Sequence, residues 1–134
     1  MANATQTETD RVREGSEAID ETYRLIASNK VEGTSVFSPD GQNIGSIHNF
    51  MVDKLSGKVS YAVMSFGGFL GIGEQYHPLP WDTLSYSEDL GGYMVNVTRE
   101  QLEEAPRYGR HDDPWTDPEY GRRVYSYYGL PFYI

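Results

Sequence analysis

Hydrophobic and polar residues alternate with a period of two from Thr34 onward, which is the pattern of half-buried β-strands. Turn residues interrupt the pattern about every ten positions, and this spacing is typical of an antiparallel β-sandwich or small barrel. The clearest turn is Pro39-Asp40-Gly41, where proline presets φ and glycine accepts a positive φ. The expected strands cover residues 35–37, 44–52, 58–66, 76–79, 81–86 and 93–97.

One helix is expected directly after the last strand. Thr98-Arg99-Glu100-Gln101 has the form of a capping box, in which the threonine and glutamine side chains bond each other's backbone amides. Leu102 would pack on the sheet, and Pro106 would end the helix. Near the N-terminus, Ser16 is expected to cap a second short helix that carries Ile19, Tyr23 and Ile26 at helical spacing.

The chain therefore divides into three parts. Residues 1–24 are an arm that is partly disordered or forms the short helix, residues 25–105 are the β domain, and residues 106–134 are a C-terminal tail. Eight aromatic residues lie in this tail, whereas disordered tails are poor in aromatics. We expect an extended tail that packs on its own β domain, with packing across a twofold in a homodimer and contact with another partner as alternatives. The candidate interaction residues are Arg122, Arg123, Tyr125, Tyr127, Tyr128, Phe132 and Tyr133.

Charge narrows the choice of partner. The 134 residues carry a net charge of −9, and residues 31–105 hold ten acids against three bases. Such a domain repels phosphate, so we expect no DNA binding and disfavour RNA, while a basic protein or a metal cation would be tolerated better. Acidity that only keeps the protein soluble is the favoured interpretation. The chain has no cysteine, which excludes a thiol nucleophile and a thiolate metal site. No apolar stretch is long enough to span a bilayer, and the N-terminus lacks the features of a signal peptide, so a cytoplasmic protein is expected.

Glycines are concentrated between positions 67 and 73, where a phosphate-binding loop is one interpretation. A P-loop requires a lysine after its last glycine, but Glu74 follows here. Pro78 and Pro80 prevent the helix whose N-terminus would bind an anion. We interpret the segment as a bend between strands, with a small-molecule or metal-ion site at the barrel mouth as the alternative. The residues concerned are Gly67, Gly68, Phe69, Gly71, Gly73, Tyr76, His77 and Trp81.

No combination of residues indicates catalysis. The histidines His48, His77 and His111 lack the spacing of a helical zinc site, and no G-x-S-x-G sequence occurs. The paired acids Glu88-Asp89 and Glu103-Glu104 are expected to lie in water, in a turn and on a helix. We therefore expect neither enzyme activity nor a cofactor nor a metal site.

Several short segments follow one another in a recognisable order. They are VEGT from Val31, PDG from Pro39, IGSI from Ile44, Asp53 with SGK from Ser56, YAV from Tyr61, and the glycine segment through Leu79-Pro80-Trp81. In this order they resemble the PRC-barrel family, which occurs in the cytoplasmic domain of the photosynthetic reaction-centre H subunit and at the C-terminus of a ribosome-maturation factor. The resemblance covers roughly residues 25–105. The end of the chain, from Tyr120-Gly121-Arg122-Arg123 onward, looks like the ends of small stand-alone bacterial members.

This resemblance implies a small, highly bent β-barrel with a helix at one end. It implies docking onto other proteins and no chemistry. The chain shows neither the membrane anchor of the H subunit nor the partner domain of the ribosomal factor, so neither specific role is carried over. The resulting hypothesis is a non-enzymatic interaction or assembly module, with ligand binding at the barrel mouth or association with the ribosome as alternatives.

Overall fold

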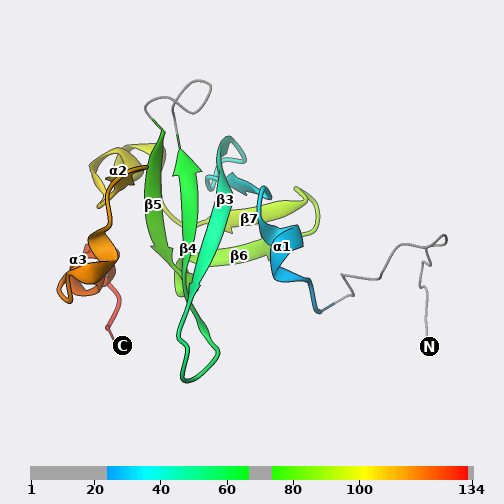
Figure 1. Ribbon diagram of the computed structural model, residues 1–134. Coiled ribbons are helices and arrows are strands. Elements are labelled where there is room, and N and C mark those ends of the chain that lie inside the picture. The colour runs from blue at the N-terminus through cyan, green and yellow to red at the C-terminus, as the bar shows by residue number, and fades with distance from the viewer. Residues whose placement is uncertain (1–23, 67–73, 133–134) are drawn as a thin grey trace. The chain divides into compact units, whose positions relative to one another are not determined.

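The computed structural model describes residues 24–66 and 74–132 (Figure 1). The chain divides into two units, residues 1–30 and residues 31–134, and each is described by itself. In the first unit, the amide of Lys30 donates to the carbonyl of Ala27 at 3.0 Å where the four-residue helix α1 (Ser28–Val31) begins. The helix predicted from Ser16 falls largely outside the described residues, and Ile26 at its end is not helical.

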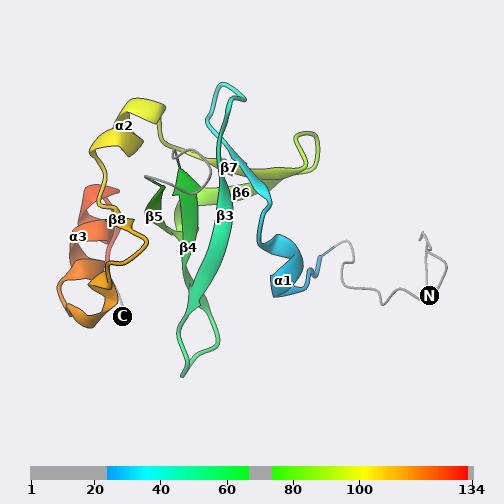
Figure 2. The same cartoon turned by 45° about the horizontal axis from the view of Figure 1, so that its top comes forward.

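The second unit is mainly β, as predicted, and its described strands form one seven-stranded sheet in the order β6-β7-β2-β3-β4-β5-β8. Strands β6 and β7 run across β3, β4 and β5 in both views, so the sheet is strongly bent (Figures 1 and 2). The strands are β2 (Ser35–Phe37), β3 (Asn43–Val52), β4 (Val59–Phe66), β5 (Gln75–Pro80), β6 (Leu84–Ser87), β7 (Gly92–Val95) and β8 (Tyr108–Gly109).

One pairing differs from the expected antiparallel arrangement. Strand β2 pairs with β7 in parallel, while the other neighbouring strands of the sheet are antiparallel. The parallel pair arises because β7 returns beside β2 only after the chain has passed through β3 to β6, and it arrives in the same direction. The edge strands β6 and β8 are not neighbours, so hydrogen bonds do not close the described sheet into a barrel.

The predicted hairpin turns are present. Gly41 has a φ of +87° in the turn between β2 and β3, and Gly57 has a φ of +78° between β3 and β4. Within β3 the expected alternation of core-facing and outward-facing side chains is interrupted, because the register against β4 shifts between Ile47 and Asn49. This bulge places Ile44 and Ile47 both in the core although they are three residues apart.

Strand β4 is buried on both faces, which explains why its sequence does not alternate. Tyr61, Ala62, Val63 and Met64 are all buried, although successive side chains point to opposite faces of a strand. Sheets covered on both faces have such continuous apolar runs. One face of β4 must therefore be covered by something other than the sheet itself.

Strand β5 tolerates two prolines because of where its second neighbour ends. Along its whole length β5 pairs with β4, but β8 pairs only with Gln75 and Tyr76. Pro78 and Pro80 come after this short pairing, where β5 becomes an edge strand and a missing amide costs little.

The predicted capped helix is confirmed as α2 (Arg99–Glu104). The amide of Gln101 donates to Thr98 Oγ1 at 3.0 Å, and the amide of Thr98 donates to Gln101 Oε1 at 2.8 Å. Leu102 is fully buried, as expected. Before β6, the segment predicted as strand begins instead with the 3₁₀ helix η1 (Trp81–Thr83), and Trp81 is only half-buried.

The prediction of an extended tail is wrong. The tail contains β8, the 3₁₀ helix η2 (Pro114–Thr116) and α3 (Tyr120–Tyr127). Helix α3 forms because Tyr120, Val124 and Tyr125 recur at helical spacing and are all buried on one side. In both views α2 and α3 lie on the β5 side of the sheet (Figures 1 and 2).

Candidate functional site

The C-terminal tail forms an apolar cluster with β4. Tyr61 of β4 belongs to the same buried cluster as Tyr120, Val124 and Tyr125 of α3. The rings of Tyr61 and Tyr125 meet edge to face with centroids 5.4 Å apart, and the Tyr125 hydroxyl donates to the carbonyl of Ser60 at 2.9 Å. These contacts cover the face of β4 that the sheet leaves open.

Gly121 allows α3 to approach β4 this closely. A Cβ at this position would lie 2.6 Å from the Tyr61 hydroxyl and 2.7 Å from a ring carbon of Phe132. Glycine is disfavoured inside a helix, so its presence here has a packing reason. The close approach also sets the width of the space beside the helix.

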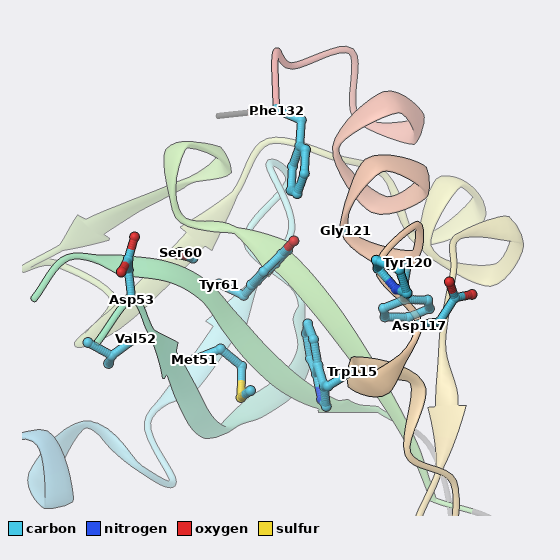
Figure 3. A pocket seen from close by; sticks show the side chains of 11 residues that line it. Met51, Val52, Asp53, Ser60, Tyr61, Trp115, Asp117, Tyr120, Gly121 and Phe132 are labelled. Atoms are coloured by element: carbon cyan, nitrogen blue, oxygen red, sulfur yellow. The ribbon is translucent and has the colours of Figure 1, made fainter. Parts of the chain in front are cut away.

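That space is a pocket of about 250 Å³ between the β3–β4 hairpin and the tail. Figure 3 shows the rings of Tyr61 and Trp115 in its middle, with Phe132 on one side. The two central rings are 5.1 Å apart between centroids, and the Trp115 indole N–H donates to the Tyr108 hydroxyl at 3.4 Å. The lining residues are Met51, Val52, Asp53, Ser60, Tyr61, Trp115, Asp117, Pro118, Tyr120, Gly121 and Phe132.

The pocket combines aromatic rings with two carboxylates. Asp53 and Asp117 line it, and these described lining residues include no lysine, arginine or histidine. Asp53 Oδ1 accepts from the amides of Leu55 at 2.9 Å and Ser56 at 3.4 Å, which fixes the carboxylate at the hairpin turn. In Figure 3 the two carboxylates lie on opposite sides of the aromatic rings.

The second carboxylate already has a basic neighbour. Asp117 Oδ2 lies 3.2 Å from an Arg123 guanidinium nitrogen, and its Oδ1 accepts from the amide of Glu119 at 2.9 Å. The hydrogen bonds from Glu119 and then Arg123 lower the pKa of Asp117. Asp117 is therefore ionised at neutral pH, and the nearby Arg123 partly balances its charge. Asp53, by contrast, has no ion pair among the described residues.

The tyrosines of the cluster stay neutral. Burial, followed by the effect of the nearby Tyr108, raises the pKa of Tyr120 to about 12. Burial is also the main cause that raises the pKa of Tyr61, followed by Tyr125 and Tyr120. Their hydroxyls and rings consequently add no negative charge to the pocket.

The structure separates the predicted tail residues into two groups. Tyr125 is buried against β4, and the hydroxyl of the half-buried Tyr128 is also buried. Arg122 and Arg123 are exposed, and Tyr127 is 40 % exposed although its hydroxyl donates to the Gln101 carbonyl at 2.6 Å. Phe132 lines the pocket, and Tyr133 lies outside the described residues.

The structure does not bring the described barrel-mouth residues together. Tyr76 and His77 are consecutive in β5, so their side chains point to opposite faces. The Tyr76 ring stacks on His48 with centroids 4.5 Å apart, while His77 meets Phe66 edge to face at 5.3 Å. The remaining members of that group, Gly67, Gly68, Phe69, Gly71 and Gly73, lie outside the described residues.

Trp81 lies at the far end of β5, away from Gln75 where the strand begins. Its ring meets Phe50 edge to face with centroids 5.3 Å apart. It therefore packs against β3 rather than joining Tyr76 or His77 around a shared space.

His77 is the most strongly perturbed described base. Its side chain is 1 % exposed, and neither ring nitrogen has a hydrogen-bond partner among the described residues. Burial, assisted by the positive charge of Arg107, lowers its pKa to about 4. His77 is therefore neutral at physiological pH and acts as a core residue.

Most of the pocket residues were not singled out from the sequence, apart from Phe132. Two signals in the sequence point to them. The run Tyr61-Ala62-Val63-Met64 is apolar without alternation, which indicates a strand covered on both faces, and Gly121 lies among apolar residues at helical spacing. What the sequence could not supply was the pairing of these two segments, which lie about sixty residues apart.

No group of three or more histidine, cysteine, aspartate or glutamate side chains that could hold a metal ion occurs in the described part of the chain. No helix within residues 24–66 and 74–132 is long and apolar enough to cross a membrane.

The family model of the PRC-barrel domain matches residues 24–102. A comparison with curated proteins finds no match to the chain.

Proposed function

Because the chain belongs to the PRC-barrel family, we propose that it is a non-enzymatic module that docks onto another protein. PRC-barrel domains often mediate protein interactions, and this is the general basis of the proposal. The docking site that we assign to it is the hairpin–tail surface, which consists of the β3–β4 hairpin tip at residues 52–55 and the pocket beside it.

The observation that carries the proposal is the exposure of apolar side chains at this hairpin tip. Leu55 is 98 % exposed and Val52 is 50 % exposed, and Val52 also lines the aromatic pocket. A single exposed leucine needs no explanation, but exposed apolar residues continuous with a half-open aromatic pocket are typical of interaction sites. Aromatic side chains are also enriched at the centres of protein interfaces.

Two features favour a different protein over a second copy of this chain. The net charge of −9 makes two copies repel each other. In addition, Tyr125 and Val124 of the tail are buried against their own barrel and have little surface left for a twofold contact. A homodimer is thus the less favoured form of the same proposal.

Site-specific photo-crosslinking in the cells of origin tests this function. A photoreactive phenylalanine analogue replaces Leu55 in one variant and Leu90, an exposed leucine at the turn between β6 and β7, in the control. We expect one protein to be captured from position 55 and not from position 90. The purified partner should then bind the full chain, and Leu55→Asp should weaken binding at least tenfold while Leu90→Asp leaves it unchanged. Equal capture at both positions, or unchanged binding by Leu55→Asp, would contradict the proposal.

A further inference from the structure

The pocket is smaller than most sites that bind cofactors or drug-sized molecules. Its volume is about 250 Å³, whereas sites for drug-sized molecules and cofactors run from about 300 to 1,000 Å³. Its walls are the rings of Tyr61, Trp115 and Phe132 with the side chain of Met51. A slender group with both apolar and polar parts fits such walls best.

The charges of the pocket select the sign of that group. Asp53 contributes one negative charge and Asp117 a second that Arg123 partly balances, and no basic side chain is among the described lining residues. Aromatic faces attract cations through the negative potential above their rings. Both elements of the pocket therefore favour a cation, and a planar guanidinium can stack on a ring and bond a carboxylate at once.

The outer side of the same tail already uses this chemistry. The Arg122 guanidinium lies 5.4 Å from the centre of the Phe132 ring, and the Arg123 guanidinium lies 5.5 Å from that of Tyr120. Arg123 also pairs with Asp117 at 3.2 Å. Phe132, Tyr120 and Asp117 all line the pocket, so guanidinium groups of this chain bind its walls from outside.

Asp53 is the carboxylate best placed to bind a further guanidinium. Its Oδ1 holds the hairpin turn through the amides of Leu55 and Ser56. Its Oδ2 has no hydrogen-bond or ion-pair partner among the described residues. Asp117, by contrast, has both oxygens engaged.

We propose that the pocket binds the side chain of an arginine presented by the protein partner, with its guanidinium bonded to Asp53 and its aliphatic part against the aromatic wall formed by Tyr61 and Trp115. This inference rests on the proposed function and adds the chemistry of the partner to it. The aliphatic part of the arginine packs on Met51, while apolar neighbours in the partner contact Val52 and Leu55.

The variants that test the proposal are chosen to keep the hydrogen bonds of the fold. Asp53→Asn removes the charge but keeps an oxygen that accepts from the amides of Leu55 and Ser56. Asp117→Asn likewise keeps an acceptor for the amide of Glu119. Asp89→Asn, in the exposed turn between β6 and β7, changes the net charge equally and serves as the control.

The probes are N-acetyl-arginine amide, its neutral isostere N-acetyl-citrulline amide, and free arginine. Binding is followed by NMR through the indole N–H signal of Trp115, with that of Trp81 as internal reference. We expect the blocked arginine to shift the Trp115 signal and the citrulline compound to leave it unchanged. Asp53→Asn should weaken binding about tenfold, as for loss of a charge-assisted hydrogen bond, and Asp117→Asn should weaken it less.

Four outcomes would overturn the proposal. Equal binding of citrulline would remove the role of charge, and unchanged binding by Asp53→Asn would remove the assigned contact. Free arginine that binds tenfold more tightly than the blocked amide would indicate a metabolite in place of a protein. The crosslinked partner separates this inference from the proposed function: if the partner binds Asp53→Asn as tightly as it binds the parent chain, docking stands and the arginine pocket falls.

Discussion

Replacing Gly121 by alanine tests whether α3 lies against β4 in solution. In a free helix the change would be stabilising, because alanine is favoured over glycine by about 1 kcal/mol in a helix interior. Here the added methyl group would lie 2.6 Å from the Tyr61 hydroxyl and 2.7 Å from Phe132. Inserting a methyl group into a packed site costs about 1–3 kcal/mol, so we expect a net loss of about 1 kcal/mol in the free energy of unfolding.

The assay is urea denaturation followed by tryptophan fluorescence, since Trp115 belongs to the cluster that the change disturbs. Ser126→Ala, at an exposed position of the same helix, is the matched control and should stabilise slightly. Adding Tyr61→Phe to Gly121→Ala removes the nearest clashing atom and should recover part of the loss. If Gly121→Ala stabilised the protein as much as Ser126→Ala does, the close packing of α3 on Tyr61 would be refuted.

Three further predictions concern the core and the capped helix. The pKa of His77 is lowered to about 4 when folded, below its ordinary value of 6.5, so stability present above pH 6.5 should be lost as pH falls toward 4. Urea titrations at each pH measure the free energy of unfolding. Between pH 6.5 and pH 4 the parent chain should lose up to about 3 kcal/mol more of it than His77→Leu does. Parallel plots of this free energy against pH for the two proteins would contradict the assignment. Thr98→Ala should cost about 1 kcal/mol by the same assay, because the bond to the Gln101 amide is lost; an unchanged midpoint would speak against the cap. Trp81→Ala should cost about 2 kcal/mol, less than a fully buried tryptophan, because the indole is half-buried against Phe50; a loss above about 4 kcal/mol would indicate a core position.

Local signals in the sequence predicted the strands and the capped helix well. Turn residues such as Gly41 and Gly57 have the positive φ that their positions suggested, and Thr98 caps α2 through the predicted pair of bonds. These features depend on neighbours within a few residues, so the residue types alone determine them. The order of the strands β2 and β7 depends on distant parts of the chain, and their parallel pairing was not foreseen.

The tail shows the limit of sequence reasoning most clearly. Its aromatic residues predict packing, on the chain's own β domain or on a partner, but Gly121 disfavours a helix and the spacing of Tyr120, Val124 and Tyr125 alone does not predict one. Helix α3 has eight residues, and a helix this short depends on tertiary packing rather than on propensity. Because the packing surface is Tyr61, about sixty residues earlier, the helix and the pocket beside it could not be located from the tail alone.

The central claim is that the tail covers β4 of its own chain and thereby forms the pocket. An isotope-filtered NOE experiment on an equal mixture of labelled and unlabelled protein measures this directly. We predict NOEs between the Tyr125 and Tyr61 rings within one chain and none between labelled and unlabelled chains, in agreement with their centroid distance of 5.4 Å. Absence of the contact within one chain, or its appearance only between chains, would contradict the account.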